Sequence, residues 1–317
     1  MRYRPLGDSG LVVSVVGLGA NNFGMRVDLE RTREVVDAAL DAGITLIDTA
    51  DVYGGRGGSE TMLGEVLKGR RDDVVLATKF GMDMGGANGP DWGARGSRRY
   101  IRRAVEASLE RLQTDWIDLY QYHAPDGLTP VEETLGALHE LVLEGKVRYV
   151  GSSNFAGWQV ADADAVARRN GFTRFVSAQN SYSLLDRTVE RELVPACRHY
   201  RVGILPYFPL SSGLLTGKYK RGEEPPEGTR LAANPRALTD RAFDTLEALE
   251  IYARERGVTM LTVAIGALAA LPAVGSVIAG ATRAEQVRAN VAAGDWQPSA
   301  EDLAALDAIV TPGRRNA

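Results

Sequence analysis

The sequence has little of several residue types, and each shortage excludes a class of structure. Cys197 is its single cysteine, which rules out a disulfide within the chain and a metal site built from several thiolates. The three histidines are scattered and form no cluster at metal-ligand spacing, so we expect no metal site. There is also no stretch of about 18 apolar residues that would predict a membrane-spanning helix.

An excess of charge is absent as well. The 317 residues include 37 Lys and Arg against 41 Asp and Glu, a formal net charge of −4. Such a chain has no positive field for a phosphate backbone, which argues against nucleic acid as a partner. The first ten residues, MRYRPLGDSG, contain no apolar targeting segment. We therefore expect a cytoplasmic, globular protein with no membrane partner, and we predict no particular oligomeric state.

What the sequence does contain is a regular alternation of short apolar runs and amphipathic segments. Continuous apolar runs are typical of parallel strands buried on both faces. The predicted strands are residues 15–19, 44–48, 74–78, 117–121, 149–153, 175–179, 203–207 and 276–280. Eight strand–helix units predict an α/β chain folded as a (β/α)8 barrel, in one domain over residues 1–317. A doubly wound open sheet is the alternative that this alternation allows.

The segments outside these units also carry signals. Residues 2–14 are predicted to form a β-hairpin with its turn at residues 7–10. Thr129 to Glu132 predicts a capping box with Pro130 at the first helical position, and Ser299 to Asp302 predicts the start of another helix. Two long segments without periodicity, residues 81–97 and 217–235, follow the third and seventh strands. In a barrel both lie at the end where such enzymes carry their active sites.

The first strand leads into a glycine-rich segment, VVGLGANNFG. A dinucleotide-binding fingerprint needs G-x-G-x-x-G, but Asn22 stands three residues after Gly19, and the next glycine is Gly24. A tight turn is therefore the simpler interpretation. Such a turn would also let a ligand approach the backbone at Gly19 and Asn21.

Four ionisable residues stand at or just beyond three neighbouring strand ends: Asp48, Tyr53, Lys79 and His123. A phenol with a pKa near ~10 is a poor acid at neutral pH unless a cation stabilises its phenolate. Lys79 can supply that cation, and Asp48 can keep the lysine charged. His123 can donate a hydrogen bond to the oxygen of a bound carbonyl. None of these side chains supplies a hydride, so a nicotinamide or flavin would have to.

These residues and their surroundings resemble the aldo-keto reductase superfamily over essentially the whole chain. The motifs that carry the resemblance are DTADVYG, TKF, GKVRYVGSSNF, AQNSYSLLDR and PLSSGLLTGKY. The resemblance implies a (β/α)8 barrel of the TIM type, closed below by an N-terminal hairpin. It also implies reduction of an aldehyde or ketone with NADPH. Tyr53 would be the general acid, tuned by Lys79 and Asp48, while His123 would orient the carbonyl.

The resemblance further implies that NADPH binds along the barrel mouth. The residues expected to contact it are Gly19, Asn21, Ser153, Asn154, Gln179, Tyr207, Leu210, Ser212, Gly213, Leu214, Lys218, Gly280, Thr282, Arg283, Gln286 and Asn290. Among them, Arg283 is expected to hold the 2′-phosphate, because a guanidinium fork suits phosphate oxygens. Phe208 departs from the family pattern and removes a hydroxyl contact to the cofactor phosphates.

The small-molecule substrate is expected to contact Tyr53 and His123, together with Phe23 and Trp92. Phe80 and Tyr122 would complete an aromatic wall. For all four aromatic residues outside the tetrad, core packing or loop anchoring is the alternative interpretation.

Two other classes of function stay open beside the reductase. Channel β-subunits of this superfamily use a bound cofactor to regulate a membrane partner, and they keep the same four residues. The sequence shows no basic or amphipathic docking tail for such a role. A Schiff-base aldolase with Lys79 as nucleophile is the other alternative, which Asp48 opposes by keeping the amine protonated.

Overall fold

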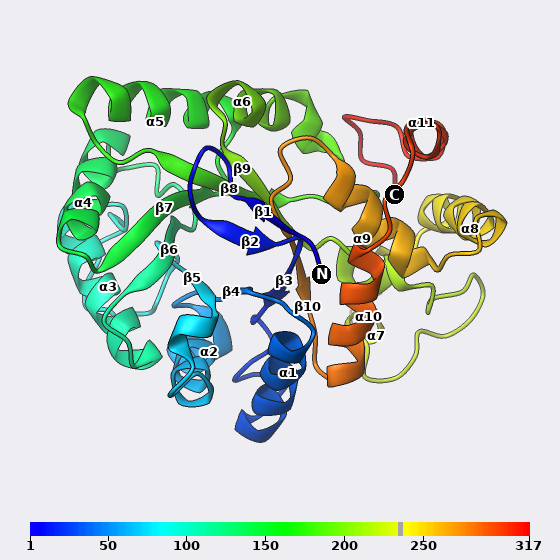
Figure 1. The fold of residues 1–317 in the computed structure, drawn as a ribbon, viewed down its shortest axis with the longest axis horizontal. Helices are drawn as coiled ribbons and strands as arrows, with labels where there is room; N and C mark the ends of the chain where they lie inside the picture. The colour runs from blue at the N-terminus through cyan, green and yellow to red at the C-terminus, as the bar shows by residue number, and fades with distance from the viewer. Residues whose placement is uncertain (234–236) are drawn as a thin grey trace.

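The computed structural model describes residues 1–233 and 237–317, in which a sheet of eight parallel strands is ringed by helices (Figure 1). The strands are β3 (Val16–Gly19), β4 (Leu46–Asp48), β5 (Val75–Phe80), β6 (Ile117–Tyr122), β7 (Val147–Ser153), β8 (Phe175–Ser181), β9 (Gly203–Tyr207) and β10 (Val277–Gly280). Their order in the sheet follows the chain, except that β10 lies beside β3. The predicted strands and the (β/α)8 architecture are confirmed.

The sheet is nearly closed where β9 approaches β10. An isolated parallel bridge joins Ile204 to Val274. The Ile204 amide donates to the Ala273 carbonyl at 2.7 Å, and the Gly275 amide donates to the Ile204 carbonyl at 2.8 Å. The gap between β9 and β10 is therefore bridged by hydrogen bonds that join β9 to the segment that leads into β10.

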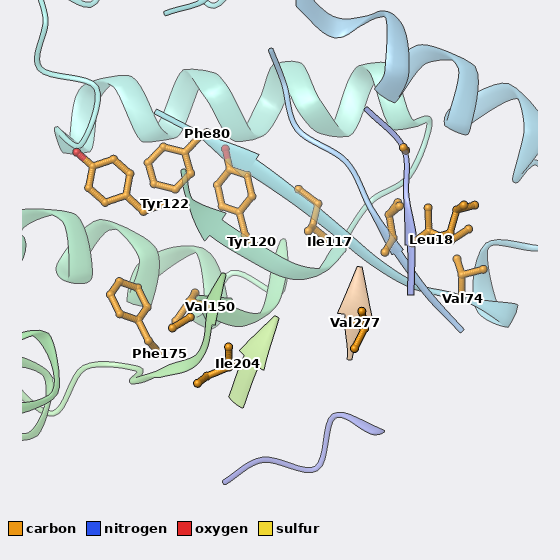
Figure 2. Packing of buried hydrophobic residues seen from close by; sticks show 14 of the residues in the cluster. Leu18, Val74, Phe80, Ile117, Tyr120, Tyr122, Val150, Phe175, Ile204 and Val277 are labelled. Atoms are coloured by element: carbon orange, nitrogen blue, oxygen red, sulfur yellow. The ribbon is translucent and has the colours of Figure 1, made fainter. Parts of the chain in front are cut away.

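Helices connect the strands and cover the outer face of the sheet. They are α1 (Leu29–Asp41), α2 (Tyr53–Val66), α3 (Arg98–Leu112), α4 (Val131–Leu143), α5 (Gly157–Asn170), α6 (Leu193–Tyr200), α7 (Arg230–Ala233), α8 (Asp240–Glu255), α9 (Met260–Ala270), α10 (Ala284–Gly294) and α11 (Ala300–Ile309). Figure 2 shows part of the main core between strands and helices, with Ile117, Val150 and Ile204. Cys197 of α6 belongs to this core, and burial raises the pKa of its thiol to about 12.

The predicted N-terminal hairpin is also confirmed. Its strands, β1 (Tyr3–Pro5) and β2 (Val12–Ser14), pair antiparallel and lie across one end of the barrel (Figure 1). Leu6, Leu11 and Val13 pack against inward-facing side chains of the barrel strands. Gly7 has φ +59°, and a Cβ there would lie 2.5 Å from the Val176 carbonyl oxygen, so only glycine fits. The hairpin thus closes the amino-terminal end of the barrel and leaves the carboxyl ends of the strands as its mouth.

One predicted helix start is wrong in detail. Pro130 is the N-cap residue of α4 rather than its first helical residue, and no side chain caps this helix. The Thr129 hydroxyl donates instead to the Asp126 carboxylate at 2.7 Å, so a capping box cannot form. The capping box of α11, formed by Ser299 and Asp302, is confirmed.

Two long connections lie at the mouth of the barrel. The β5–α3 loop, residues 81–97, has no helix or strand, as predicted. The β9–α8 connection, residues 208–239, contains a 3-10 segment (Ser211–Thr216) and α7, so part of the predicted 217–235 loop is helical. Residues 234 and 235 of that prediction lie outside the described residues. Leu214, Leu215 and Leu231 of this connection pack in an apolar cluster of their own with side chains of α8, α9 and α11.

Candidate active site

The four ionisable residues predicted to act together meet at the barrel mouth. Asp48 ends β4, Lys79 lies near the end of β5, His123 directly follows β6 and Tyr53 begins α2. The Lys79 ammonium donates to Asp48 Oδ2 at 2.6 Å and to the Thr49 carbonyl at 2.8 Å. Its Nζ lies 5.1 Å from the centre of the Tyr53 ring. The Tyr53 and His123 rings approach edge to face, with centroids 5.8 Å apart.

An unusual turn fixes Tyr53 at the start of α2. The residues that follow it have positive φ angles, including Gly54 at +69° and Arg56 at +72°. A Cβ at Gly54 would lie 2.4 Å from the Ser59 amide and 2.6 Å from the Phe23 carbonyl oxygen. Only glycine can make this approach, so the GGRGG segment folds back on itself and holds the tyrosine toward the mouth.

The charges of the site follow from burial and pairing. Burial lowers the pKa of the Lys79 ammonium, but Asp48 and Tyr53 raise it more, so the pKa ends above its ordinary value and the lysine is charged at neutral pH. Burial raises the pKa of the Tyr53 phenol, and Lys79 opposes this rise without cancelling it. The expected effect of Lys79 on the phenol is therefore present, but burial outweighs it.

His123 is neutral at physiological pH. Burial first, and the charge of Lys79 second, lower the pKa of its imidazole to about 3. Its Nδ1 is buried and has no hydrogen-bond partner among the described residues. Its carbonyl oxygen accepts a 2.9 Å hydrogen bond from the Asn154 amide group. A neutral imidazole can donate a hydrogen bond while leaving no second positive charge beside Lys79.

Two buried glutamines hold the other oxygen of Asp48. Gln121 Nε2 donates to Asp48 Oδ1 at 3.1 Å, and Gln179 Nε2 donates to the same atom at 2.8 Å. Gln179, predicted to contact the cofactor, is thus also a support of the ion pair. Gln121 was missed in the sequence, although its position opposite Lys79 in the β5–β6 register could have indicated it.

Three of the predicted cofactor residues contact one another beside the tetrad. The Tyr207 hydroxyl donates to Asn154 Oδ1 at 2.7 Å, and Asn154 Nδ2 donates to Ser153 Oγ at 3.2 Å. Asn154 has φ +59° and is exposed, so its side chain is displayed at the strand end rather than packed in the core. The Tyr207 ring is half-buried and meets the Phe208 ring edge to face at 5.1 Å.

The residues predicted to follow β9 form a backbone turn. Ser212 and Gly213 have φ angles of +59° and +97°. A Cβ at Gly213 would lie 2.9 Å from Lys218 Nζ, so the lysine lies against this turn. Leu210 borders both apolar clusters, whereas the Leu214 side chain is buried in the cluster of the β9–α8 connection. Leu214 can therefore offer a ligand only its backbone.

The turn after β3 lies next to the end of β10. Gly19 and Gly280 are register partners, and a Cβ at Gly280 would lie 3.5 Å from Asn21 Oδ1 and 3.4 Å from Asn22 Nδ2. Gly280 is exposed although its strand neighbours are buried. The exposed position here is therefore Gly280, whereas Gly19 and Asn22 of the turn are buried and Asn21 is half-buried.

The predicted residues after β10 divide into exposed and structural ones. Arg283 is exposed and stands at the N-cap of α10. Gln286 Oε1 accepts a 2.8 Å hydrogen bond from the Thr282 amide, so this pair holds the turn into the helix. Asn290 is buried on the inner side of α10.

Several cations around the mouth have no carboxylate in ion-pair range among the described residues. They are Arg26, Lys218, Arg230 and Arg283. Arg230 of α7 was missed in the sequence because it lies in a segment without periodicity. Its guanidinium donates to Asn22 Oδ1 at 3.2 Å, and burial and then Arg26 lower its pKa. Unpaired cations at the mouth fit the phosphates of a dinucleotide.

The predicted aromatic wall is largely core. Phe23 is 0% exposed, and Phe80 and Tyr122 stack at 5.2 Å within the main core (Figure 2). These three side chains contribute packing, the alternative interpretation of each. Trp92 is 74% exposed in the β5–α3 loop, where the Arg99 guanidinium lies 4.3 Å from its ring centre.

No group of three or more potential ligands in residues 1–233 and 237–317 is arranged to hold a metal ion. In the same residues, no helix is both long and apolar enough to cross a membrane.

Comparison with known proteins agrees with this geometry. Residues 15–311 match the model of a family described as the aldo/keto reductase family. The chain belongs to the aldo/keto reductase family. Among its curated relatives, the "Uncharacterized oxidoreductase YrpG" of Bacillus subtilis is 39% identical over 98% of this chain and 96% of the relative. The "L-glyceraldehyde 3-phosphate reductase" of Escherichia coli (strain K12) is 35% identical over 100% and 94%. A "Probable voltage-gated potassium channel subunit beta" of Oryza sativa subsp. japonica is 36% identical over 98% and 97%.

Proposed function

We propose that this aldo/keto reductase reduces aldehydes or ketones to alcohols with NADPH, and that Tyr53 is the general acid. The observation that carries the proposal is the buried Lys79–Asp48 ion pair, which lies against the Tyr53 ring beside a neutral histidine. Such a group of residues provides a proton, a cation to stabilise the phenolate and a donor for the carbonyl oxygen. Residues 1–317 act as one domain in this proposal.

The chain's own residues handle the carbonyl oxygen. His123 donates a hydrogen bond to that oxygen and orients the substrate. When bound, NADPH supplies a hydride to the carbonyl carbon. Tyr53 gives its phenolic proton to the oxygen, which completes the alcohol, and the Lys79 ammonium stabilises the phenolate left behind. Asp48, Gln121 and Gln179 keep the lysine charged and in place.

The cofactor residues group by the chemistry they offer. Ser153, Asn154 and Gln179 would bind the carboxamide, and the Tyr207 ring would stack on the nicotinamide. Lys218 and the backbone of Ser212 and Gly213 would contact the pyrophosphate, with Leu210 and Leu214 supporting that turn. Gly19, Asn21, Gly280, Thr282, Gln286 and Asn290 would shape the groove. Arg283 is proposed for the 2′-phosphate, and Arg230 joins it as a further candidate cation.

Two alternatives make different use of the same residues. The relative named as a potassium channel β-subunit supports a regulatory role, in which a cofactor binds without rapid turnover. An aldolase would need Lys79 as a neutral amine, but its partners raise the pKa of Lys79. The aldolase is therefore the weaker alternative.

The test is to titrate the protein with NADPH by fluorescence and then to follow NADPH oxidation with a panel of aldehydes and ketones. We expect binding with turnover. Tyr53→Phe should lose carbonyl reduction by about 10²–10⁴-fold, because the proton donor is removed, while NADPH binding stays close to that of the parent. Arg283→Ala is the matched cofactor-side variant, and it should weaken NADPH binding more than NADH binding.

Three results would contradict different parts of this proposal. Binding without turnover would support the regulatory role and contradict the reductase. Full activity in Tyr53→Phe would contradict the assignment of the acid, and equal loss of NADPH and NADH by Arg283→Ala would remove this residue from the 2′-phosphate site.

A further inference from the structure

A second group of ionisable side chains lies behind the tetrad. Asp51 and Glu60 are both fully buried. Arg111 of α3 donates to Glu60 Oε2 at 2.7 Å, and the Thr78 hydroxyl donates to Glu60 Oε1 at 2.5 Å. Asp51 has no ion pair among the described residues, so the two carboxyl groups share one arginine. A buried group of this composition favours a state in which one carboxyl keeps its proton.

The hydrogen bonds indicate which carboxyl this is. Asp51 Oδ2 accepts a 3.1 Å hydrogen bond from Asn88 Nδ2, but Asp51 Oδ1 is buried without a partner among the described residues. The Tyr120 hydroxyl is likewise buried and unpartnered. Glu60, by contrast, has both oxygens occupied by donors. A negative charge on Asp51 is therefore stabilised by fewer hydrogen-bond donors than a negative charge on Glu60.

The electrostatic surroundings agree with this assignment. Burial and then Glu60 raise the pKa of Asp51 to about 8, while Arg111 and Asn88 lower it in part. The titratable or charged groups that face the cluster are Glu60 and Tyr53 from α2, Tyr100 and Arg111 from α3, Tyr120 from β6 and Lys79 from β5. Asp51 is thus protonated at neutral pH.

Asp51 is also connected directly to the proposed acid. Its amide donates to the Lys79 carbonyl at 3.0 Å, and it precedes Tyr53 by two residues. Burial is the main cause that raises the pKa of Tyr53, and the charge of Asp51 acts in the same direction. An ionised Asp51 would therefore oppose formation of the phenolate, which the reduction requires.

We propose that Asp51 is a positioning residue for the reduction: it retains its proton, so that its own negative charge does not add to that of Asp48 in opposing release of the Tyr53 proton. Asp51 transfers no proton to the substrate. Its loss of a proton slows the step by making the Tyr53 phenolate less stable. This inference rests on the proposed function, in which Tyr53 is the acid.

The main test is the pH profile of kcat for carbonyl reduction in the parent and in Asp51→Asn. The amide matches the carboxyl in shape and can still accept the Asn88 hydrogen bond, but it cannot ionise. We expect the parent's kcat to fall with a midpoint near pH 8. For Asp51→Asn, each kcat is divided by the value that this variant has at lower pH. The resulting profile should lack the fall near pH 8.

Glu60→Gln is the opposing variant. With one negative charge removed, Arg111 is left to stabilise the Asp51 carboxylate, so the fall in kcat should move to lower pH. A purely structural role for this cluster would lower activity in both variants without abolishing the midpoint in Asp51→Asn or lowering it in Glu60→Gln. An unchanged midpoint in both variants would overturn the proposal.

The pH dependence of the free energy of unfolding, measured without substrate, also tests whether Asp51 holds a proton. Between the pKa of Asp51 in the unfolded chain and its value near 8 in the fold, the folded state holds one proton more than the unfolded state. Relative to that of Asp51→Asn, the parent's free energy of unfolding should therefore decline with rising pH over this interval, with a slope that corresponds to about one proton. Equal slopes would overturn the inference. Full activity in Tyr53→Phe, in contrast, would contradict the proposed function while leaving this stability result intact.

Discussion

The two long connections at the barrel mouth are held in opposite ways. The β5–α3 loop is anchored by polar groups: Asn88 reaches the buried carboxyl of Asp51, and the Gly96 amide donates to Asp126 at 2.7 Å. The β9–α8 connection is anchored by apolar side chains, among them Leu215 and Leu231. Directional hydrogen bonds in a buried setting depend on charge and protonation, whereas apolar packing depends on volume.

The two kinds of anchoring correspond to two parts of the proposed reaction, which are proton transfer to the carbonyl and binding of the cofactor. The β5–α3 loop is hydrogen-bonded through Asn88 to Asp51, which precedes the proposed acid Tyr53 by two residues. The apolar connection carries the Ser212–Gly213 turn and Lys218, where a cofactor phosphate is expected. A change of charge should therefore affect carbonyl turnover first, and a change of volume should affect cofactor binding first.

The largest expected effect comes from removing the guanidinium group of Arg111, which donates to Asn88 of the β5–α3 loop. Arg111→Met leaves Glu60 buried without its counter-ion, which typically costs about 3–5 kcal/mol of unfolding free energy. Denaturant unfolding measures this loss. Glu60→Gln in the same chain should recover a large part of it, because no unpaired carboxylate then remains. If the double variant is no more stable than Arg111→Met, the ion pair is not the source of the loss.

A somewhat smaller effect is expected in the apolar connection. Leu215 is 0% exposed, and Leu215→Ala should cost about 2–4 kcal/mol through lost burial and a cavity. The dissociation constant for NADPH should also rise, because Leu215 and the Ser212–Gly213 turn share one 3-10 segment. Leu128→Ala, at an exposed position in another loop, is the control. Unchanged NADPH binding in a clearly destabilised Leu215→Ala would break the link between packing and the cofactor turn.

The smallest of the three effects is local. Asn88→Ala removes the side-chain bonds from the β5–α3 loop to Asp51, Tyr100 and Arg111, at a cost of about 1–3 kcal/mol. Amide hydrogen exchange should become faster in residues 81–97, and KM for the carbonyl should rise more than the dissociation constant for NADPH. Ala87→Ser, at the exposed neighbouring position, should change neither quantity. Equal exchange in Asn88→Ala and the parent would show that other contacts hold the loop.

The strands and the tetrad could be predicted because their signals are local. Each buried parallel strand is a short apolar run, and Asp48, Lys79 and His123 each follow or end such a run. The hairpin was equally clear from its turn residues. Thr129 misled the prediction of a helix start because its hydroxyl has a nearer partner in Asp126, which a capping pattern does not reveal.

The buried polar cluster could not be predicted in the same way. Asp51 and Glu60 share one segment, but Asn88 and Arg111 lie far from it in the sequence, and each of the four resembles an ordinary surface residue. Only the packing of α2 against α3 brings them together and removes them from water. Phe23 shows the converse, because an aromatic residue in a turn near the mouth turned out to face the core.

The solitary thiol has a practical consequence for studying the two connections. Cys197 is fully buried and its pKa is far above neutrality, so it presents almost no thiolate to an alkylating or oxidising reagent. A cysteine introduced at an exposed site, such as Ala87 in one connection or Glu223 in the other, would be the one accessible thiol among the described residues. Fluorophores or spin labels could then report the movement of each connection separately, without first replacing Cys197.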